Sequence, residues 1–259
     1  MKLVYTFSSQ FTPFIYKTNN VDKILTAYIN YYRKSIISAL KLDYKIDFYV
    51  SDELKYNFKD LPINLIRVNE VKSGLFDFLK AEVLIERTDE IMLVDGDIEF
   101  HKPIPISDHD LIYDFKCITA EGDEYDDIRK DKTWNVFYKP YVNLLTELGI
   151  GSVIPEWTGK RLDFIHNIGV LYFNNQNLKS TYVDRWAKFN EFINYNIEDK
   201  IPYTAIGAQY LLSEIINYHG FSSIEVEEGC YTHNLGIDKF KFPSVSTHEV
   251  QKEEKKSFL

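Results

Sequence analysis

Short apolar runs and longer amphipathic stretches alternate along the first half of the chain. Four apolar runs predict strands, at residues 3–7, 46–50, 63–68 and 91–94. The last run, Ile-Met-Leu-Val, is apolar on both faces, as in the middle of a sheet. Apolar residues that recur every three or four positions predict a helix over 22–42 and a second around residues 75–84. This alternation predicts an α/β fold built on a parallel or mixed sheet.

The second half of the chain is less regular. Residues 119–162 are rich in charge, Gly and Pro, and only about 137–148 looks helical, so we interpret this stretch as a functional insertion. A strand is predicted at 168–173, and helices are predicted near 181–195 and 204–217. Because we find no internal repeat and no linker, we expect a single domain over residues 1–245, followed by a polar tail at 246–259.

Composition narrows the possible function classes. Thirty basic and 39 acidic residues give a formal charge of −9, which argues against a general nucleic-acid binder. No apolar run approaches the ~18 to 20 residues that span a bilayer, so we expect no membrane span, and peripheral membrane association stays open. Two cysteines, Cys117 and Cys230, are too few for a disulfide framework. With no signal-peptide core at the start, we expect a cytoplasmic protein with reduced thiols.

Two carboxylates follow the strand predicted at 91–94. Asp95 and Asp97 flank Gly96, and alternation along an extended chain points both carboxylates to the same side. Ligands of open α/β sheets bind at the carboxyl ends of strands, and two hard oxygen ligands suit Mg²⁺ or Mn²⁺ while leaving room for phosphate oxygens. Gly96 would let another group approach the backbone. The alternative interpretation is a solvated loop, because Asp-x-Asp is common by chance.

A second group of candidates lies in the segment Thr-His-Asn-Leu-Gly-Ile-Asp-Lys at 232–239. His233 offers a nitrogen ligand, Gly236 lets backbone amides face an anion, and Lys239 offers a positive charge to the same anion. Taken alone, His233 is better explained as an ordinary histidine in an exposed loop.

Together the two motifs resemble the metal-dependent, nucleotide-sugar glycosyltransferases of the GT-A fold. This resemblance implies a single α/β domain with a central mixed, mostly parallel sheet flanked by helices. Within these they are similar to the retaining family-eight type, which includes glycogenin and bacterial lipopolysaccharide galactosyl- and glucosyltransferases. That family combines an Asp-x-Asp at a strand end with a C-terminal His-x-x-Gly-x-x-Lys, and residues 95–97 and 233–239 match both in order. The resemblance implies a Mn²⁺ or Mg²⁺ ion held by Asp95, Asp97 and His233, with Gly236 and Lys239 against the diphosphate.

The resemblance also assigns roles to other positions. It implies a nucleotide-sugar-binding half at about 1–105, with Thr6 and Phe7 at the nucleobase and Lys80 facing the donor, and an acceptor half at about 106–245. Asn167 matches a donor-sugar asparagine, and Gln209 matches a glutamine close to the anomeric carbon. Each has a plainer interpretation: a turn before a strand for Asn167, a solvated helix lysine for Lys80, and a partly covered helix face for Gln209.

The activity implied by the resemblance is transfer of a hexose from UDP-glucose or UDP-galactose to a sugar or glycan acceptor, with retention. Two positions depart from the family pattern: Phe240-Lys241 follows Lys239 instead of Pro-Trp, and Ala208 precedes Gln209 where the family has an acid. These departures keep open a non-catalytic nucleotide-sugar-binding protein. A phosphatase of the haloacid-dehalogenase type ranks lower, because that type carries Asp-x-Asp on its first strand and continues with Gly-Thr.

Overall fold

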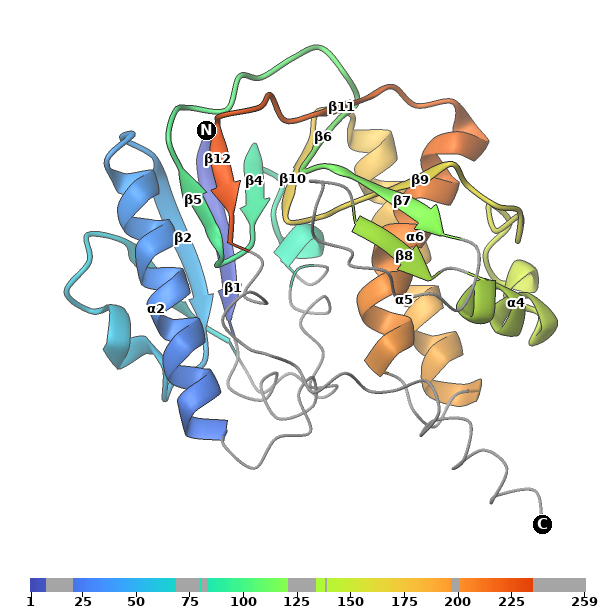
Figure 1. Ribbon diagram of the computed structural model, residues 1–259, viewed down its shortest axis with the longest axis horizontal. Helices are drawn as coiled ribbons and strands as arrows, with labels where there is room; N and C mark the ends of the chain where they lie inside the picture. The colour runs from blue at the N-terminus through green and yellow to red at the C-terminus, as the bar shows by residue number, and fades with distance from the viewer. Residues whose placement is uncertain are drawn as a thin grey trace.

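A computed structural model describes residues 1–7, 21–68, 80, 83–120, 134–137, 139–196 and 201–234 (Figure 1). The elements in chain order are β1 Lys2–Phe7, α2 Val21–Leu40, β2 Lys45–Val50, the 3-10 turn η2 Lys55–Phe58, β3 Asn64–Arg67, β4 Ile91–Val94, β5 Ile98–Phe100, β6 Leu111–Tyr113, β7 Lys116–Ala120, β8 Trp134–Phe137, α4 Lys139–Glu147, the 3-10 turn η3 Ile150–Ser152, β9 Phe164–His166, β10 Val170–Phe173, α5 Gln176–Asn196, α6 Ile201–His219, β11 Ser223–Glu225 and β12 Tyr231–His233.

A seven-stranded sheet with the order β11-β6-β10-β4-β1-β2-β3 forms the centre of the fold. β10 runs antiparallel to both of its neighbours, β4 and β6, and every other adjacent pair in this sheet is parallel. The predicted α/β class, with a mixed, mostly parallel sheet, is therefore confirmed. Two smaller sheets accompany it: β5 pairs with β12, and β7 lies between β8 and β9.

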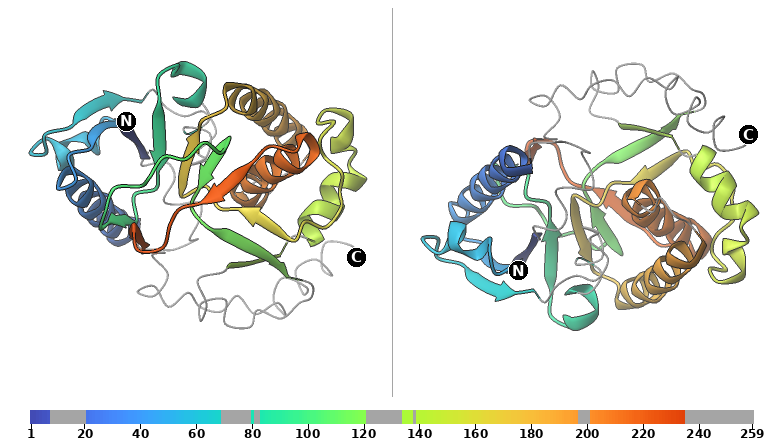
Figure 2. Two further views of the ribbon diagram at one scale, coloured as in Figure 1. Left: turned by 90° about the horizontal axis from the view of Figure 1, so that it is seen from above. Right: turned by 90° about the horizontal axis from the view of Figure 1, so that it is seen from below.

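Helices cover both faces of the central sheet, with α2 on one side and α5 and α6 on the other (Figures 1 and 2). Side chains alternate along a strand, so Leu3, Tyr5 and Phe7 join the cluster that contains Ile36 of α2. Val4 points the other way and joins the cluster that contains α5 and α6. Both faces of β1 are thus buried, which explains its mainly apolar sequence.

Most predicted elements coincide with the observed ones to within a few residues, including α2, α5, α6 and the strands β1, β2, β3, β4 and β10. Of the helix predicted around 75–84, only residues 80, 83 and 84 are described, and they are helical. Seven short strands were not predicted, namely β5, β6, β7, β8, β9, β11 and β12. Each has three to five residues, too few for an apolar pattern to stand out.

The interpretation of 119–162 as an insertion is wrong for its later part. α4 lies where a helix was expected, and Val142, Leu145, Ile150 and Ile154 are buried in the same hydrophobic cluster as α5 and α6. From residue 139 onward this stretch is therefore part of the core. Residues 121–133 lie outside the described part of the chain.

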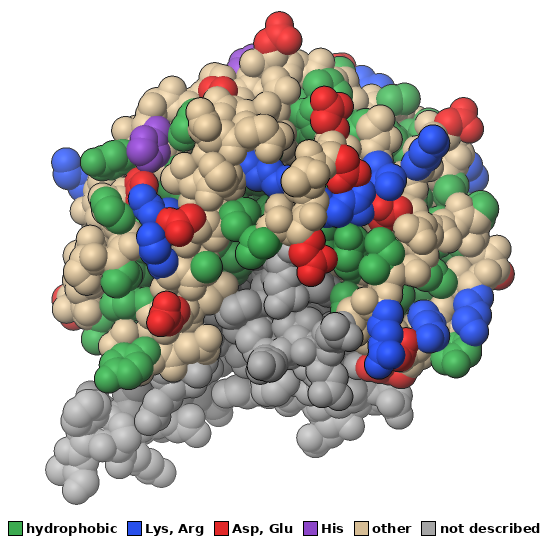
Figure 3. Space-filling view, turned by 180° about the vertical axis from the view of Figure 1, so that it is seen from behind, with side chains coloured by type: hydrophobic (Ala, Val, Ile, Leu, Met, Phe, Trp, Pro, Cys, Tyr) green, Lys and Arg blue, Asp and Glu red, His purple; other side chains and the backbone are tan. Residues whose placement is uncertain are grey.

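Surface chemistry agrees with the acidic, mixed composition. On the face drawn in Figure 3, Lys and Arg side chains lie among Asp and Glu side chains. Within the described ranges, no helix combines the length and apolar character needed to cross a membrane. Cys117 and Cys230 are both free cysteines with buried side chains.

Candidate functional site

The strand order brings three chain segments together at one edge of the central sheet. β4 ends at Val94, which lies opposite Val170 at the start of antiparallel β10. β6 in turn ends beside the same end of β10, with Tyr113 opposite Leu171. The residues just after β4, just after β6 and just before β10 therefore converge.

Main-chain hydrogen bonds fix this convergence. The Asp95 N–H donates to the Gly169 carbonyl at 2.7 Å, and the Asp114 N–H donates to the Asn167 carbonyl at 3.3 Å. The two aspartates, from different strand ends, are thereby held on either side of the turn into β10.

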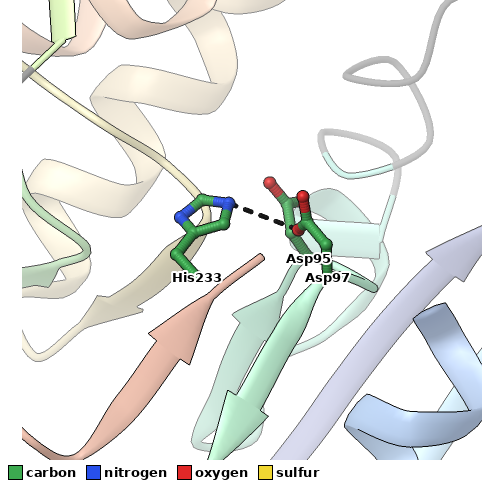
Figure 4. Close-up of side chains that lie close together, drawn as sticks. All are labelled: Asp95, Asp97 and His233. Atoms are coloured by element: carbon green, nitrogen blue, oxygen red, sulfur yellow. Dashed lines mark ion pairs between the residues drawn. The ribbon is translucent and has the colours of Figure 1, made fainter. Parts of the chain in front are cut away.

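The pairing of β5 with β12 brings in the histidine from the far end of the chain. His233 is in register with Ile98, and the Asn234 N–H donates to the Asp97 carbonyl at 2.8 Å. His233 therefore arrives beside Asp97, with 3.3 Å between His233 Nε2 and Asp97 Oδ1 (Figure 4). This two-strand pairing is the structural reason that His233 meets the Asp95–Asp97 motif.

Asp95, Asp97 and His233 form a group whose ligand atoms all lie within 4.8 Å of one another. Their side chains are 21%, 24% and 10% exposed, so each of the three is only partly buried. Two carboxylates and one imidazole are a donor set that suits Mn²⁺ or Mg²⁺. Three protein ligands do not complete a six-coordinate shell, so positions remain for ligand oxygens. The residues present therefore fit a divalent cation.

Lys80 belongs to this site and is not a solvated helix lysine. Its ammonium lies 2.5 Å from Asp95 Oδ1 and donates to the Ile168 carbonyl at 3.2 Å, and the side chain is only 5% exposed. Burial raises the pKa of Asp95; Lys80 opposes this shift and the Asp97 charge adds to it. A bound cation would act in the same direction as Lys80 and stabilise the charged form of the partly buried Asp95 carboxylate.

For the pKa of His233, neighbouring charges outweigh the effect of burial. Burial lowers its pKa, but the flanking Asp114 and Asp97 carboxylates outweigh burial and hold the pKa of His233 well above its usual value. A proton on the imidazole thus balances the carboxylates, and a metal ligated by Nε2 would replace that proton.

Two glycines allow groups to approach the site backbone closely. A Cβ at Gly96 would lie 2.3 Å from the Tyr32 ring, and a Cβ at Gly169 would lie 2.3 Å from Asp114 Oδ2 and 2.7 Å from His233 Cε1. The close approach expected at Gly96 is therefore present, and the approaching group is the Tyr32 ring. The Tyr32 hydroxyl donates to the Thr6 carbonyl at 2.7 Å, which links the Asp95–Asp97 turn to the end of β1.

Asn167 and Gln209 are linked through a side chain that the sequence did not single out as part of the site. Asn167 Oδ1 accepts from the Gly169 N–H at 2.8 Å, and its amide nitrogen donates to Cys117 Sγ at 3.8 Å. The Cys117 thiol donates to Gln209 Oε1 at 3.9 Å. Burial raises the pKa of Cys117 to about 12, so the sulfur stays protonated and can donate. Gln209 is partly exposed and borders this group.

Four predicted site residues remain: Thr6, Phe7, Gly236 and Lys239. Thr6 is buried at the end of β1, and its hydroxyl has no hydrogen-bond partner within the described residues. The Phe7 ring is fully buried and stacks on Tyr32 with centroids 4.4 Å apart, so it is a core side chain. Gly236 and Lys239 lie outside the described residues.

Asp114 and Tyr231 are contacts of the site that sequence reasoning missed. Asp114 Oδ2 lies 2.6 Å from His233 Nδ1, and the Tyr231 hydroxyl donates to the same carboxylate. The signal for Asp114 was present, because it follows the apolar run Leu111–Tyr113 just as Asp95 follows β4.

Comparison with solved structures gives similarities to two glycosyltransferases. The chain is 13% identical to the galactosyltransferase LgtC in complex with donor and acceptor sugar analogues, over 87% of this chain and 73% of that one, with a TM-score of 0.40. It is also 13% identical to the apo form of the glycosyltransferase GlyE of Streptococcus pneumoniae TIGR4, over 86% of this chain and 44% of that one, with a TM-score of 0.42. No family model and no curated protein matches the sequence. Because the identities and TM-scores are low, we base the function on the site itself.

Proposed function

We propose that the protein is a metal-dependent glycosyltransferase that moves a hexose from a nucleotide diphosphate sugar to a sugar or glycan acceptor. The observation that carries the proposal is the meeting of Asp95, Asp97 and His233 at a strand-end edge of the sheet, although His233 is remote in sequence. The sequence motifs that contain these residues resemble those of UDP-sugar enzymes, so UDP-glucose and UDP-galactose are the donors to test first.

The chemistry requires that charge on the departing diphosphate be neutralised as the bond to the anomeric carbon breaks. A divalent cation held by Asp95, Asp97 and His233 would supply this as a Lewis acid. In the chain itself, Lys80 holds Asp95 in place through a 2.5 Å ion pair and adds a positive charge beside the cluster. We assign Lys239 to the diphosphate as a second cation, on the motif alone.

The sugar would lie on the side of Asn167 and Gln209. Asn167 is fixed by the Gly169 N–H, and the Cys117 thiol donates to the oxygen of Gln209. An amide oxygen in this position can stabilise the positive charge that develops on the anomeric carbon. Neither side chain can act as a base, which favours retention of the donor configuration over inversion.

A non-catalytic nucleotide-sugar-binding protein is the second candidate. Two sequence features favour it, Ala208 before Gln209 and Phe240-Lys241 after Lys239. Such a protein would bind the metal and the nucleotide sugar but would not break the glycosidic bond.

Turnover of radiolabelled UDP-glucose and UDP-galactose separates the two candidates. With Mn²⁺ present, we expect release of labelled sugar to water or to an added glycan mixture, and we expect EDTA to stop it. Asp97→Asn should reduce this rate by a factor on the order of 100, because it removes one metal ligand. Mn²⁺-dependent binding of both donors without any turnover would support the binding protein instead.

A further inference from the structure

We propose that Asp114 is a positioning residue that orients His233 toward the metal, an inference that rests on the proposed function. Asp114 Oδ2 lies 2.6 Å from His233 Nδ1, and the Asp114 side chain is fully buried. His233 Nε2, on the other side of the ring, lies 3.3 Å from Asp97 Oδ1. The imidazole therefore bridges a buried carboxylate and the candidate metal ligands.

Asp114 is itself held by Tyr231, which lies on the same strand, β12, as His233. The Tyr231 hydroxyl donates to Asp114 Oδ1 and also reaches the Asp114 carbonyl oxygen, at 3.1 Å. Tyr231 and His233 are two residues apart on β12, so their side chains point to the same side of the strand. Both therefore meet the same carboxylate, one at each oxygen.

The ring has little room to move away from this carboxylate. Gly169 packs closely against both Asp114 and His233, since a Cβ at this position would be 2.3 Å from Asp114 Oδ2 and 2.7 Å from His233 Cε1. The Phe115 ring packs edge-on to the imidazole, with centroids 5.7 Å apart and planes at 66°. Packing and the ion pair thus select one ring orientation.

A carboxylate on Nδ1 determines which nitrogen is available to a cation. A cation at Asp95 and Asp97 would displace the Nε2 proton, and the remaining proton would then stay on Nδ1, which faces the Asp114 carboxylate. Carboxylate–histidine–metal arrangements of this kind fix the tautomer and the ring orientation, and their loss typically costs 10- to 100-fold in metal affinity. Asp114 would contact neither substrate nor metal, so its effect is transmitted through His233.

Calorimetric titration of the full chain with Mn²⁺ alone tests this inference. Asp114→Leu removes the acceptor at similar volume, and we expect Mn²⁺ affinity to fall about 10- to 100-fold. Asp114→Asn keeps an oxygen that can accept from Nδ1–H, and we expect it to recover most of that loss. In a background of His233→Ala, Asp114→Leu should weaken Mn²⁺ binding no further, because its effect acts through that ring.

Asp47→Asn is the matched control. Asp47 is also a buried carboxylate with cationic partners, 2.8 Å from Lys2 and 2.6 Å from Arg87, but it belongs to β2, and within the described residues its partners are Lys2, Arg87 and Asn64 rather than residues of the site. It should lower the melting temperature without changing Mn²⁺ affinity.

The outcomes separate the inference from the function on which it rests. If His233→Ala loses Mn²⁺ binding while folded Asp114→Leu binds Mn²⁺ as wild type does, the positioning role is refuted and the proposed function stands. Equal losses in Asp114→Asn and Asp114→Leu would also refute it, because the hydrogen-bond acceptor would then be irrelevant. Failure of the wild-type chain to bind Mn²⁺ would contradict the proposed function and the inference together.

Discussion

Replacing Gly169 with alanine places one methyl group at the centre of the site. The added Cβ would lie 2.3 Å from Asp114 Oδ2, 2.7 Å from His233 Cε1 and 3.0 Å from Asn167 Oδ1, whereas ordinary contacts of a Cβ are 3.4–4 Å. The backbone of Gly169 is not in the left-handed region, so alanine fails for lack of space alone. Asp114 and His233 must each retreat by roughly an ångström, although Asp114 is buried and is held by both Tyr231 and His233.

Overpacking of this kind costs about 1–3 kcal/mol in the free energy of unfolding. For a chain of this length that corresponds to a fall of roughly 2–12 °C in melting temperature. Because the displaced groups include a metal ligand and its carboxylate partner, we expect Mn²⁺ affinity to fall at least about tenfold. Differential scanning calorimetry and Mn²⁺ titration measure the two effects.

Gly151→Ala is the matched control for this substitution. Its Cβ would meet only the Trp157 carbonyl oxygen, at 3.7 Å, and Gly151 also has no left-handed backbone. We expect wild-type Mn²⁺ affinity and unchanged or slightly higher stability, by about 0.4–1 kcal/mol. A Gly169→Ala protein with the melting temperature and Mn²⁺ affinity of wild type would refute the packing described around His233.

Three further predictions concern ligand binding, pH and stereochemistry. Lys239→Ala should weaken UDP binding by about 10- to 150-fold and uridine binding much less, because a charge-assisted contact to phosphate is lost. Calorimetric titration with both ligands measures the two losses. Equal losses for UDP and uridine would contradict a phosphate contact. Burial lowers the pKa of His166 to about 3, between the Ser213 and Ser223 hydroxyls, so the unfolded chain binds a proton that the folded chain does not. The stability contributed by neutral His166 is complete above its unfolded pKa of ~6.5 and decreases as the pH falls below that value. Between pH 7 and pH 5, the free energy of unfolding measured in urea should therefore fall by about 2 kcal/mol more in wild type than in His166→Gln. Equal pH profiles for the two proteins would contradict this prediction. The first-formed sugar product should keep the α configuration of the donor, which proton NMR reads from a small anomeric coupling constant; a β product would redirect the search for a base to the acidic residues at 121–127.

The sequence predicted five of the seven strands of the central sheet, β1, β2, β3, β4 and β10, because these lie in mainly apolar runs, and it missed β6 and β11. Residues 3–7 and 91–94 could not be mistaken for exposed segments, and the position of Asp95 at the end of such a strand followed directly. β5 and β12 have three residues each, and their pairing depends on contacts between distant parts of the chain that no local pattern encodes. His233 could therefore be predicted as a candidate ligand from the sequence, but local sequence patterns could not show that it lies beside Asp97.

The supporting side chains were harder to predict than the candidate ligands. Asp114 follows an apolar triplet, which resembles the context of Asp95, but one aspartate after a short run has no motif to distinguish it. Cys117 was expected only to be a reduced thiol, and its contacts with Asn167 and Gln209 arise from the packing of β7 near α6. From the sequence, Lys80 could equally be a solvent-exposed helix residue or a residue of the site. Its ion pair with Asp95 in the structure assigns it to the site.

A thermal-shift panel of UDP, GDP and ADP, each with and without Mn²⁺, tests the metal-dependent nucleotide site most directly. At a ligand concentration a hundredfold above Kd, binding stabilises the folded chain by about 2.7 kcal/mol, or roughly 5–10 °C for a protein of this size. We predict that UDP with Mn²⁺ gives this shift in wild type, that omitting Mn²⁺ removes most of it, and that Asp97→Asn abolishes the dependence on Mn²⁺. A UDP shift of equal size without Mn²⁺, or one that Asp97→Asn leaves intact, would contradict the site described here.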